Sequence, residues 1–166
     1  MPAGSTYSTI ATYTAPSSQA SYTFSSIPST YTDLIVVCST FNSSGPDDLR
    51  LRFNSDTGTN YSATLLRGSG SAIVNAKDNN GTYLAWLGYV SSNSNNTSTT
   101  IFQVMNYSNT SVNKTVLSRG NLATDFVNAT VGMWRSTAAI NSITLIAGGA
   151  NITSGSTFTI YGIAAA

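Results

Sequence analysis

Apolar and polar residues alternate with a period of two along most of the chain, and clusters of polar residues interrupt this alternation at short intervals. Because successive side chains of a strand point to opposite faces, the alternation predicts strands that bury one face. Many short strands separated by turn clusters are typical of a β-sandwich or a β-barrel. The expected strands comprise residues 7–13, 21–27, 34–41, 49–53, 61–67, 83–90, 101–105, 112–117, 129–135, 140–146 and 157–163.

Two of these segments carry apolar residues on both faces, namely residues 34–41 and residues 83–90. A strand that is apolar on both faces is typical of a position inside a sheet, so we expect residues 34–41 to form a central strand. The predicted core residues are Leu34, Val36, Phe53, Trp86, Leu87, Phe102, Val104, Leu145, Phe158 and Ile160.

These elements predict an all-β fold, a two-sheet antiparallel β-sandwich of jelly-roll-like type with its sheets about 10 Å apart. Residues 21–166 are predicted to form a single β-sandwich domain, and residues 1–20 form either an N-terminal arm or a first strand. Residues 120–127 are compatible with one helical turn. The Ser- and Asn-rich tract 91–96 is predicted to be a loop.

Composition strengthens the all-β assignment. Ser, Thr and Asn account for 66 of the 166 residues, while 41% of the chain is hydrophobic and can build a core. Glu, Lys and Gln, which favour helices, are nearly absent, whereas Thr, Val, Ile and Tyr favour strands and Ser, Asn and Gly favour turns.

The charge of the chain is low and nearly balanced, with seven Lys or Arg, six Asp, no Glu and no His, for a formal net charge of +1. No broad electrostatic field is therefore available to bind a nucleic acid or an anionic membrane. Mechanisms that need a His base, a Glu acid or several His metal ligands are excluded. We expect no cofactor, and no nucleic-acid or membrane partner.

The single cysteine, Cys38, lies in an apolar run, so it is predicted to be a small buried residue without a disulfide partner. The first five residues are neither basic nor apolar, and we therefore expect no signal peptide. No apolar run approaches the roughly 20 residues of a membrane helix. Synthesis in a cytosol is the simplest expectation.

The chain has six aspartates and no Glu, so any catalytic pair of carboxylates would have to come from these six residues. A glycosidase needs two carboxyl groups roughly 5 Å or roughly 6.5–9.5 Å apart, and the sequence neither places nor excludes such a pair. Because Asp stabilises turns through its own backbone, we interpret each aspartate as a turn residue. They are Asp33, Asp47, Asp48, Asp56, Asp78 and Asp125.

Asn54, Asp56 and Asn60 stand at alternate positions around Gly58, as oxygen ligands do in a calcium loop. A complete calcium loop also needs a later bidentate acid, commonly Glu, which this chain lacks. We therefore predict a hairpin turn at residues 54–60, and no metal site. Residues 77–81 end in an Asn-Gly pair and are also predicted to be a turn.

A nucleophilic serine needs a base, and the chain has no His. Lys77 is predicted to lie in a turn and Lys114 in a polar stretch, so neither resembles the base of a pocket. Residues 68–71 are a flexible turn, and no phosphate-binding loop of the P-loop or dinucleotide type is present. We expect no enzymatic activity, and we predict no catalytic or cofactor-binding residues.

The expected strands carry Ser, Thr or Asn on the face away from the core and few charged residues. Soluble monomers usually carry dispersed charges, and charged residues usually protect edge strands. A chain without this protection is predicted to cover its edges in a symmetric assembly that docks on a larger structure. A neutral but monomeric surface is the alternative.

Three segments, in this order, resemble a β-sandwich module of virion structural proteins from tailed bacteriophages. They are residues 22–34 (YTFSSIPSTYTDL), followed by the apolar strand 35–37, then residues 49–62 (LRLRFNSDTGTNYS) and residues 155–163 (GSTFTIYGI). The resemblance spans residues 6–163. It implies a jelly-roll-like unit that occurs in tail fibres and as a free-standing capsid cement or decoration protein, and it carries over no catalytic residue.

This resemblance leads us to expect a capsid decoration protein that forms a homotrimer, binds the major capsid protein on the virion surface and is made in the host cytoplasm. The alternative is a tail-fibre or receptor-binding module that engages host-surface polysaccharide. In that case exposed aromatic side chains such as Tyr83, Tyr107 and Trp134 would stack on sugars.

Residues 2–14 suggest where adhesion would reside. This stretch is small, polar and uncharged, with Tyr7, Ile10 and Tyr13 spaced three apart. As an arm it would gain backbone hydrogen bonds by adding to an exposed strand of a neighbour. As a first strand it would belong to the sandwich itself.

Overall fold

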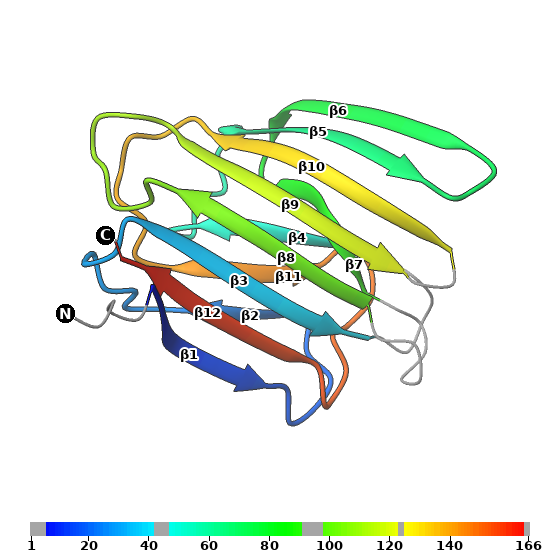
Figure 1. The fold of residues 1–166 in the computed structure, drawn as a ribbon, viewed down its shortest axis with the longest axis horizontal. Helices are drawn as coiled ribbons and strands as arrows, with labels where there is room; N and C mark the ends of the chain where they lie inside the picture. Colours follow the sequence, from blue (N-terminus) through cyan, green and yellow to red (C-terminus); the bar gives the residue numbers. More distant parts are fainter. Residues whose placement is uncertain (1–5, 42–46, 91–97, 123–124, 165–166) are drawn as a thin grey trace.

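The computed structural model describes residues 6–41, 47–90, 98–122 and 125–164, and its fold is all-β, as predicted (Figure 1). Within these residues the strands form two antiparallel sheets, a jelly-roll-like β-sandwich without a helix. The strands are β1 (Tyr7–Thr14), β2 (Ser21–Phe24), β3 (Asp33–Thr40), β4 (Asp47–Phe53), β5 (Tyr61–Gly68), β6 (Ile73–Gly81), β7 (Leu84–Val90), β8 (Ser98–Met105), β9 (Lys114–Leu122), β10 (Phe126–Trp134), β11 (Ile143–Ala147) and β12 (Thr157–Ile163).

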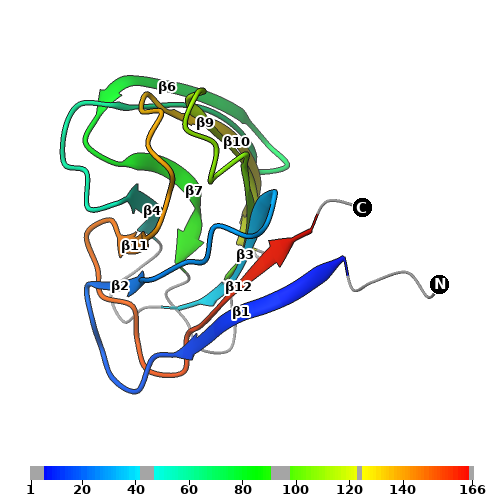
Figure 2. The ribbon, with the colours of Figure 1, turned by 90° about the vertical axis from the view of Figure 1, so that its left-hand side faces the viewer.

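The larger sheet has the strand order β1-β12-β3-β8-β9-β10-β5-β6, and the smaller sheet has the order β2-β11-β4-β7. Figure 2 shows the larger sheet curving around the smaller one. Strand β3 lies between β12 and β8, so residues 34–40 occupy the central position that their two-sided apolar pattern predicts. The described part of the chain contains no helix of the length and apolarity needed to cross a membrane.

Residues 7–14 form β1, which pairs with β12 from Tyr7 opposite Ile163 to Thr14 opposite Thr157. They therefore adopt the arrangement of a first strand of the sandwich, with a register shift between Thr9 and Ala11.

The core lies between the two sheets, and nine of the ten predicted core residues are fully buried in it. Trp86 is the exception, because it is only half-buried and packs against the edge of the core. It has a positive φ of 58° and lies in an irregular part of β7, where Leu49 pairs with Gly88 but Leu51 pairs with Leu84. Such an irregularity turns one side chain out of the alternation.

Strand β7 is an edge strand of the smaller sheet, and side chains of the larger sheet bind its carbonyl groups. Thr130 Oγ1 donates to the Trp86 carbonyl at 2.5 Å, and Asn128 Nδ2 donates to the same oxygen at 3.1 Å. Ser118 Oγ donates to the Leu87 carbonyl. These bonds satisfy backbone groups that would otherwise be buried without a partner.

The prediction that residues 77–81 form a turn is wrong. Residues 73–81 form β6, which pairs with β5 from Gly68 opposite Ile73 to Tyr61 opposite Gly81. Both faces of β6 are largely solvent-exposed, so its sequence shows no alternation of apolar and polar residues. Only pairing with β5 makes this segment a strand.

The helical turn predicted for residues 120–127 is also wrong for the described residues. Residues 120–122 end β9 and residues 126–127 begin β10, and Asp125 donates its N–H to the Leu122 carbonyl at 2.8 Å in the turn between them. The predicted loop 91–96 lies outside the described residues.

Candidate functional site

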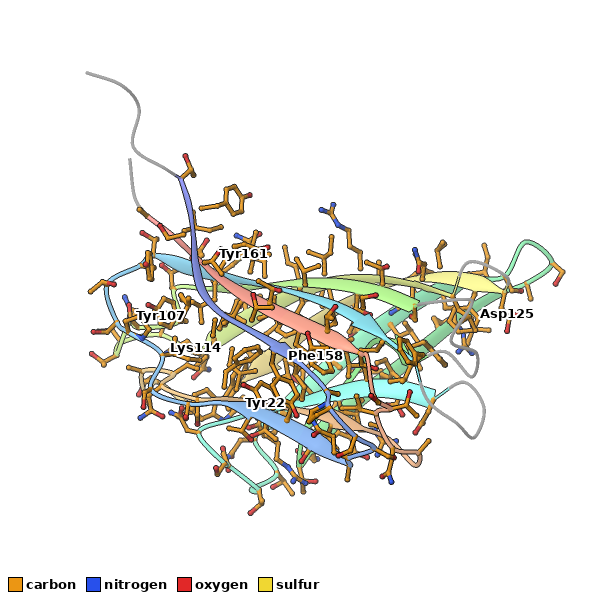
Figure 3. The ribbon with its side chains drawn as sticks, turned by 90° about the horizontal axis from the view of Figure 1, so that it is seen from below. Tyr22, Tyr107, Lys114, Asp125, Phe158 and Tyr161 are labelled. Carbon is orange, nitrogen blue, oxygen red and sulfur yellow. The ribbon has the colours of Figure 1, made fainter. Side chains whose placement is uncertain are left out.

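The outer face of the larger sheet is the most unusual surface of the molecule. Alternate residues of its strands are buried in the core, so the remaining residues must point outward, as Tyr161 does while Phe158 of the same strand points inward (Figure 3). The described strands bring only three charged residues to this face: Asp33, Lys77 and Arg119. Six of its strands carry many apolar side chains on this face, namely Ile35, Val37, Leu66, Ile73, Ile101, Met105, Leu117, Val127, Ala129, Val131 and Met133.

The apolar residues of β10 are on the outside because the usual pattern of this strand is inverted. Asn128 and Thr130 point inward and are buried, since they bind the carbonyl groups of β7. Val127 and Val131 therefore point outward and are 64% and 53% exposed. Sequence reasoning missed this surface because alternation identifies the two faces of a strand without saying which one is buried.

Five outward residues form a continuous group that we call the apolar patch. They are Leu66 on β5, Ile73 on β6, and Val127, Ala129 and Val131 on β10. Ala129 lies directly opposite Leu66, while Val127 and Ile73 flank Gly68 on either side. Leu66 is 58% and Ile73 78% exposed.

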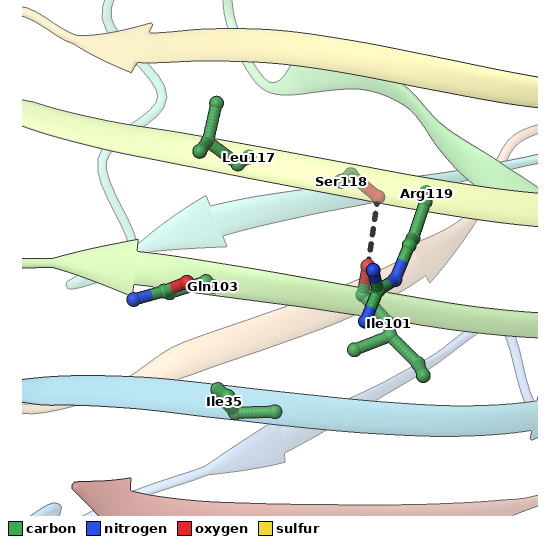
Figure 4. A pocket seen from close by; sticks show the side chains of 6 residues that line it. All are labelled: Ile35, Ile101, Gln103, Leu117, Ser118 and Arg119. Carbon is green, nitrogen blue, oxygen red and sulfur yellow. Dashed lines mark hydrogen bonds between the residues drawn. The ribbon is translucent and has the colours of Figure 1, made fainter.

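A shallow hollow of about 210 Å³ lies beside the apolar patch, over β3, β8 and β9 (Figure 4). Ile101 pairs with Arg119 and Gln103 pairs with Leu117, so aliphatic and polar side chains alternate around it. The hollow is smaller than the roughly 300–1,000 Å³ of a typical small-molecule site. Its lining residues are Ile35, Ile101, Gln103, Leu117, Ser118 and Arg119.

Two charged residues at this hollow, Asp33 and Arg119, differ in their hydrogen bonding. The Asp33 carboxylate accepts hydrogen bonds from Gln103 Nε2 at 2.9 Å and from the Asn106 N–H at 2.8 Å. The side chain of Arg119, in contrast, makes no hydrogen bond or ion pair with the part of the chain that the structure describes. Its guanidinium group is therefore available to a carboxylate or carbonyl group of a partner.

The segment with calcium-like spacing is a turn in which N–H groups of the segment and of β10 point at Asp56. Asp56 accepts hydrogen bonds from Trp134 Nε1 at 2.6 Å, from Asn60 Nδ2 at 2.9 Å and from the Gly58 N–H at 2.8 Å. Burial acts to raise the pKa of Asp56, but these hydrogen bonds outweigh it and hold the pKa below its usual value. N–H groups that point at a carboxylate oppose the approach of a cation.

The turn itself differs from the predicted hairpin, because residues 54–60 connect β4 of the smaller sheet to β5 of the larger sheet. Asn54 Oδ1 accepts hydrogen bonds from the Asn141 and Ser142 N–H groups at 2.9 and 3.2 Å, so it also faces donors. Across the described residues, no three His, Cys, Asp or Glu side chains are grouped so that they could hold a metal ion.

Asp47 and Asp48 begin β4 and do not lie in the predicted turn. Asp47 accepts hydrogen bonds from the N–H groups of Gly149 and Ala150, which outweigh the effect of burial and lower its pKa. Asp48 forms an ion pair with Arg50 at 2.7 Å. Both carboxylates are thus engaged within the fold.

The two remaining aspartates lie apart from these groups. Asp78 is part of β6 and accepts a hydrogen bond from the Asn80 N–H at 3.2 Å, whereas Asp125 lies in the turn before β10. Asp125 is thus a turn residue, as predicted, and Asp78 is not.

The two lysines also differ from expectation. Lys77 lies in β6 and not in a turn. Lys114 is fully buried at the start of β9, where its Nζ donates to the carbonyl groups of Val112 at 2.8 Å and Thr137 at 3.2 Å. Burial lowers the pKa of Lys114. The only sequence signal for this burial was that Lys114 stands in step with the inward positions of β9, which recur every second residue.

Cys38 is fully buried and free, as predicted, and burial raises the pKa of its thiol.

The aromatic residues expected to stack on sugars do not form such a platform. Tyr107 is fully buried and Trp134 is 2% exposed, so the expectation that they are exposed is wrong. Tyr83 is half-buried, and the guanidinium group of Arg50 lies 4.6 Å from its ring centre. Tyr107 and Lys114 lie at the same end of the molecule in Figure 3, between the sheets.

No family model matches this sequence, and no curated protein matches it. Among solved structures, the galectin LEC-6 of Caenorhabditis elegans is similar over 90% of this chain and 94% of its own, with 11% identity and a TM-score of 0.46. The exo-inulinase of Aspergillus awamori is similar over 95% of this chain but only 29% of its own, with 15% identity and a TM-score of 0.41. Values this low carry no information about ligand or activity.

Proposed function

We propose that this chain is an adhesive structural protein of a bacteriophage particle, namely a capsid cement or decoration protein that binds major capsid subunits and turns over no substrate. The observation that carries the proposal is the nearly uncharged, aliphatic outer face of the larger sheet, with the unpaired Arg119 beside its hollow. The resemblance of residues 22–34, 49–62 and 155–163 to virion β-sandwich modules supplies the setting.

The chemistry of this face suits contact with a protein surface. Removing aliphatic side chains from water contributes about 25 cal/mol per Å² of apolar surface buried. A carboxylate on the partner would pair with Arg119, and Arg is enriched in the centres of protein interfaces. The shallow shape of the hollow favours an inserted side chain over an enclosed substrate.

A reconstitution experiment tests this function. Particles that lack the protein are mixed with purified chain and pelleted, and the bound copies are counted. We expect Ile101→Lys to abolish binding. Arg119→Gln should weaken binding about thirtyfold or more, since removing one partner of a buried charge pair costs about 2–5 kcal/mol. The matched control is Thr9→Lys, which adds a charge to the exposed outer side of β1. Equal binding by all three variants would refute the proposed surface.

Copy number in the intact particle separates the proposal from its alternative, a tail-fibre or receptor-binding module. Hundreds of copies place the protein on the shell, and a few dozen at most place it in the tail. Tyr107 and Trp134 do not support the alternative, because both side chains are buried and cannot stack on a sugar.

A further inference from the structure

The apolar patch on β10, β5 and β6 presents a surface that the hollow beside Arg119 does not include. It combines four large aliphatic side chains that are each more than half exposed with one alanine between them. Exposed apolar patches of more than a few hundred Å² usually mark an interaction site. We infer that the apolar patch is a contact between two copies of this chain, which pack face to face about a two-fold axis.

Charge favours a second copy as the occupant. The chain has a net charge of only +1, so two copies do not repel each other strongly. The two outer strands of the proposed contact each carry one outward cation, Arg119 on β9 and Lys77 on β6, and no hydrogen-bond acceptor for either side chain is found among the described residues. The patch itself carries no charge, and Arg119 and Lys77 lie on the outer strands of the contact, where their long side chains can keep the charged ends in water.

The strand register specifies how the copies would fit. A two-fold axis that runs along the strands between β10 and β5 places each β10 over the β5 of the second copy. Leu66 then faces Ala129 of the second copy, because these residues occupy the same row of the sheet. By the same symmetry Arg119 faces Asn75 of the second copy rather than another cation, since both residues also lie in that row. The resulting contact has an apolar centre and a polar rim, as protein interfaces usually do.

The area of this contact is sufficient for a weak dimer. The contact covers the three strands that carry the patch and also β9, so it includes Leu117 and Arg119 at the border of the hollow. Four strands about 4.8 Å apart, each about eight residues long at about 3.3 Å per residue, cover roughly 500 Å² per copy. The two copies together bury roughly 1,000 Å², which is at the lower end of specific interfaces. The trimer that we expected from the sequence would not place two identical patches opposite each other, because that arrangement requires a two-fold axis.

The first test is the mass of the purified chain in solution, measured by sedimentation equilibrium over a wide concentration range. We expect the mass to rise from one chain to two with increasing concentration. Leu66→Lys should raise the dissociation constant about tenfold or more, because the interface would bury an unpaired ammonium group. The control is Thr9→Lys, also an exposed position on the outer side of β1, which should leave the dissociation constant unchanged.

The second test uses crosslinking through a single introduced cysteine. Cys38 is fully buried, so Leu66→Cys provides the accessible thiol. Position 66 lies next to the proposed axis, and a short thiol-reactive crosslinker should join two copies. Thr9→Cys lies on β1, so its thiols would be roughly 50 Å apart across the dimer and should not be joined.

Three results would overturn the inference. They are a one-chain mass at all concentrations, a dimer that Leu66→Lys leaves intact, and a three-chain mass. Because these experiments use the purified chain without any particle, a failure here is separate from a failure of shell binding. Unchanged circular dichroism and thermal unfolding of each variant show that the fold is retained.

Discussion

At the scale of single residues, Gly88 allows β7 to approach the larger sheet closely. A Cβ atom at this position would lie 1.7 Å from Thr100 Oγ1, far inside contact distance. We expect Gly88→Ala to lower the free energy of unfolding by about 1–3 kcal/mol, the usual cost of overpacking a core. The measurement is urea denaturation. Gly68→Ala is the control, because its Cβ would meet no atom within 4 Å and the variant should keep full stability.

Tyr61 makes the stability of the protein sensitive to alkaline pH. Burial raises the pKa of Tyr61 to about 12, compared with 10.0 for a free tyrosine. Between these values the unfolded chain loses the proton and the folded chain keeps it. The contribution of Tyr61 to stability is therefore complete below pH 10 and is lost as the pH rises from 10 toward 12.

Tyr61→Phe tests this dependence. The Tyr61 hydroxyl oxygen accepts a hydrogen bond from the Phe53 N–H at 3.0 Å, and that donor would be left buried without a partner. We expect the variant to lose about 1–3 kcal/mol at neutral pH and to show a smaller further loss between pH 10 and pH 12. Tyr161→Phe, on the outer face, is the comparison. A variant at position 61 whose alkaline loss equals that of the wild-type chain would contradict the assignment.

At the scale of elements, β7 depends on side chains that come from the opposite sheet. Thr130→Val keeps the shape of the side chain but removes the hydroxyl group that donates to the Trp86 carbonyl. We expect a loss of about 1–3 kcal/mol, since a buried carbonyl loses a partner, and faster hydrogen exchange in β7 than elsewhere. Thr64→Val on the exposed outer side of β5 is the matched control. Equal exchange rates in the two variants would show that β7 does not need this bond.

Strand β1 is expected to contribute to stability in the same way. The ring of Tyr13 stacks on Tyr22 with their centres 3.6 Å apart, and the Tyr13 hydroxyl donates to Gln19 Oε1 at 2.7 Å. Deleting residues 2–14 removes this contact and exposes β12, so we expect a loss of about 3 kcal/mol or more in thermal or urea unfolding. A deletion of residues 2–5 serves as the control. A shortened chain with unchanged stability would instead identify the stretch as an arm.

The sequence predicted most strands because their alternation matched their burial, as in β4 and β12, or because both faces were apolar, as in β3. It missed β6 because an exposed edge strand needs no alternation, and its Asn and Asp residues favour turns when read alone. It also missed the inverted pattern of β10, where tertiary hydrogen bonds to β7 decide which face is buried. The apolar patch depends on both of these elements.

At the scale of the whole molecule, pairing of the folded chains should make thermal stability depend on concentration. Association stabilises only the folded state, so the Tm should rise as the protein concentration increases. We expect Leu66→Lys to remove this dependence while leaving the Tm of the dilute chain unchanged, because the side chain is exposed. Differential scanning calorimetry at several concentrations measures both. A Tm of the variant that still rises with concentration would indicate a different contact.

By itself the sequence determined the all-β class, the central place of β3, which is apolar on both faces, and the burial of most core residues. These features follow from the local pattern of apolar residues and from the transfer of apolar side chains out of water. Only the tertiary structure decided that β10 turns its valines outward, that Lys114 and Tyr107 are buried, and that β6 exists. These features depend on partners distant in sequence, such as the carbonyl groups of β7 for β10 and the β5 ladder for β6, and no local pattern records them.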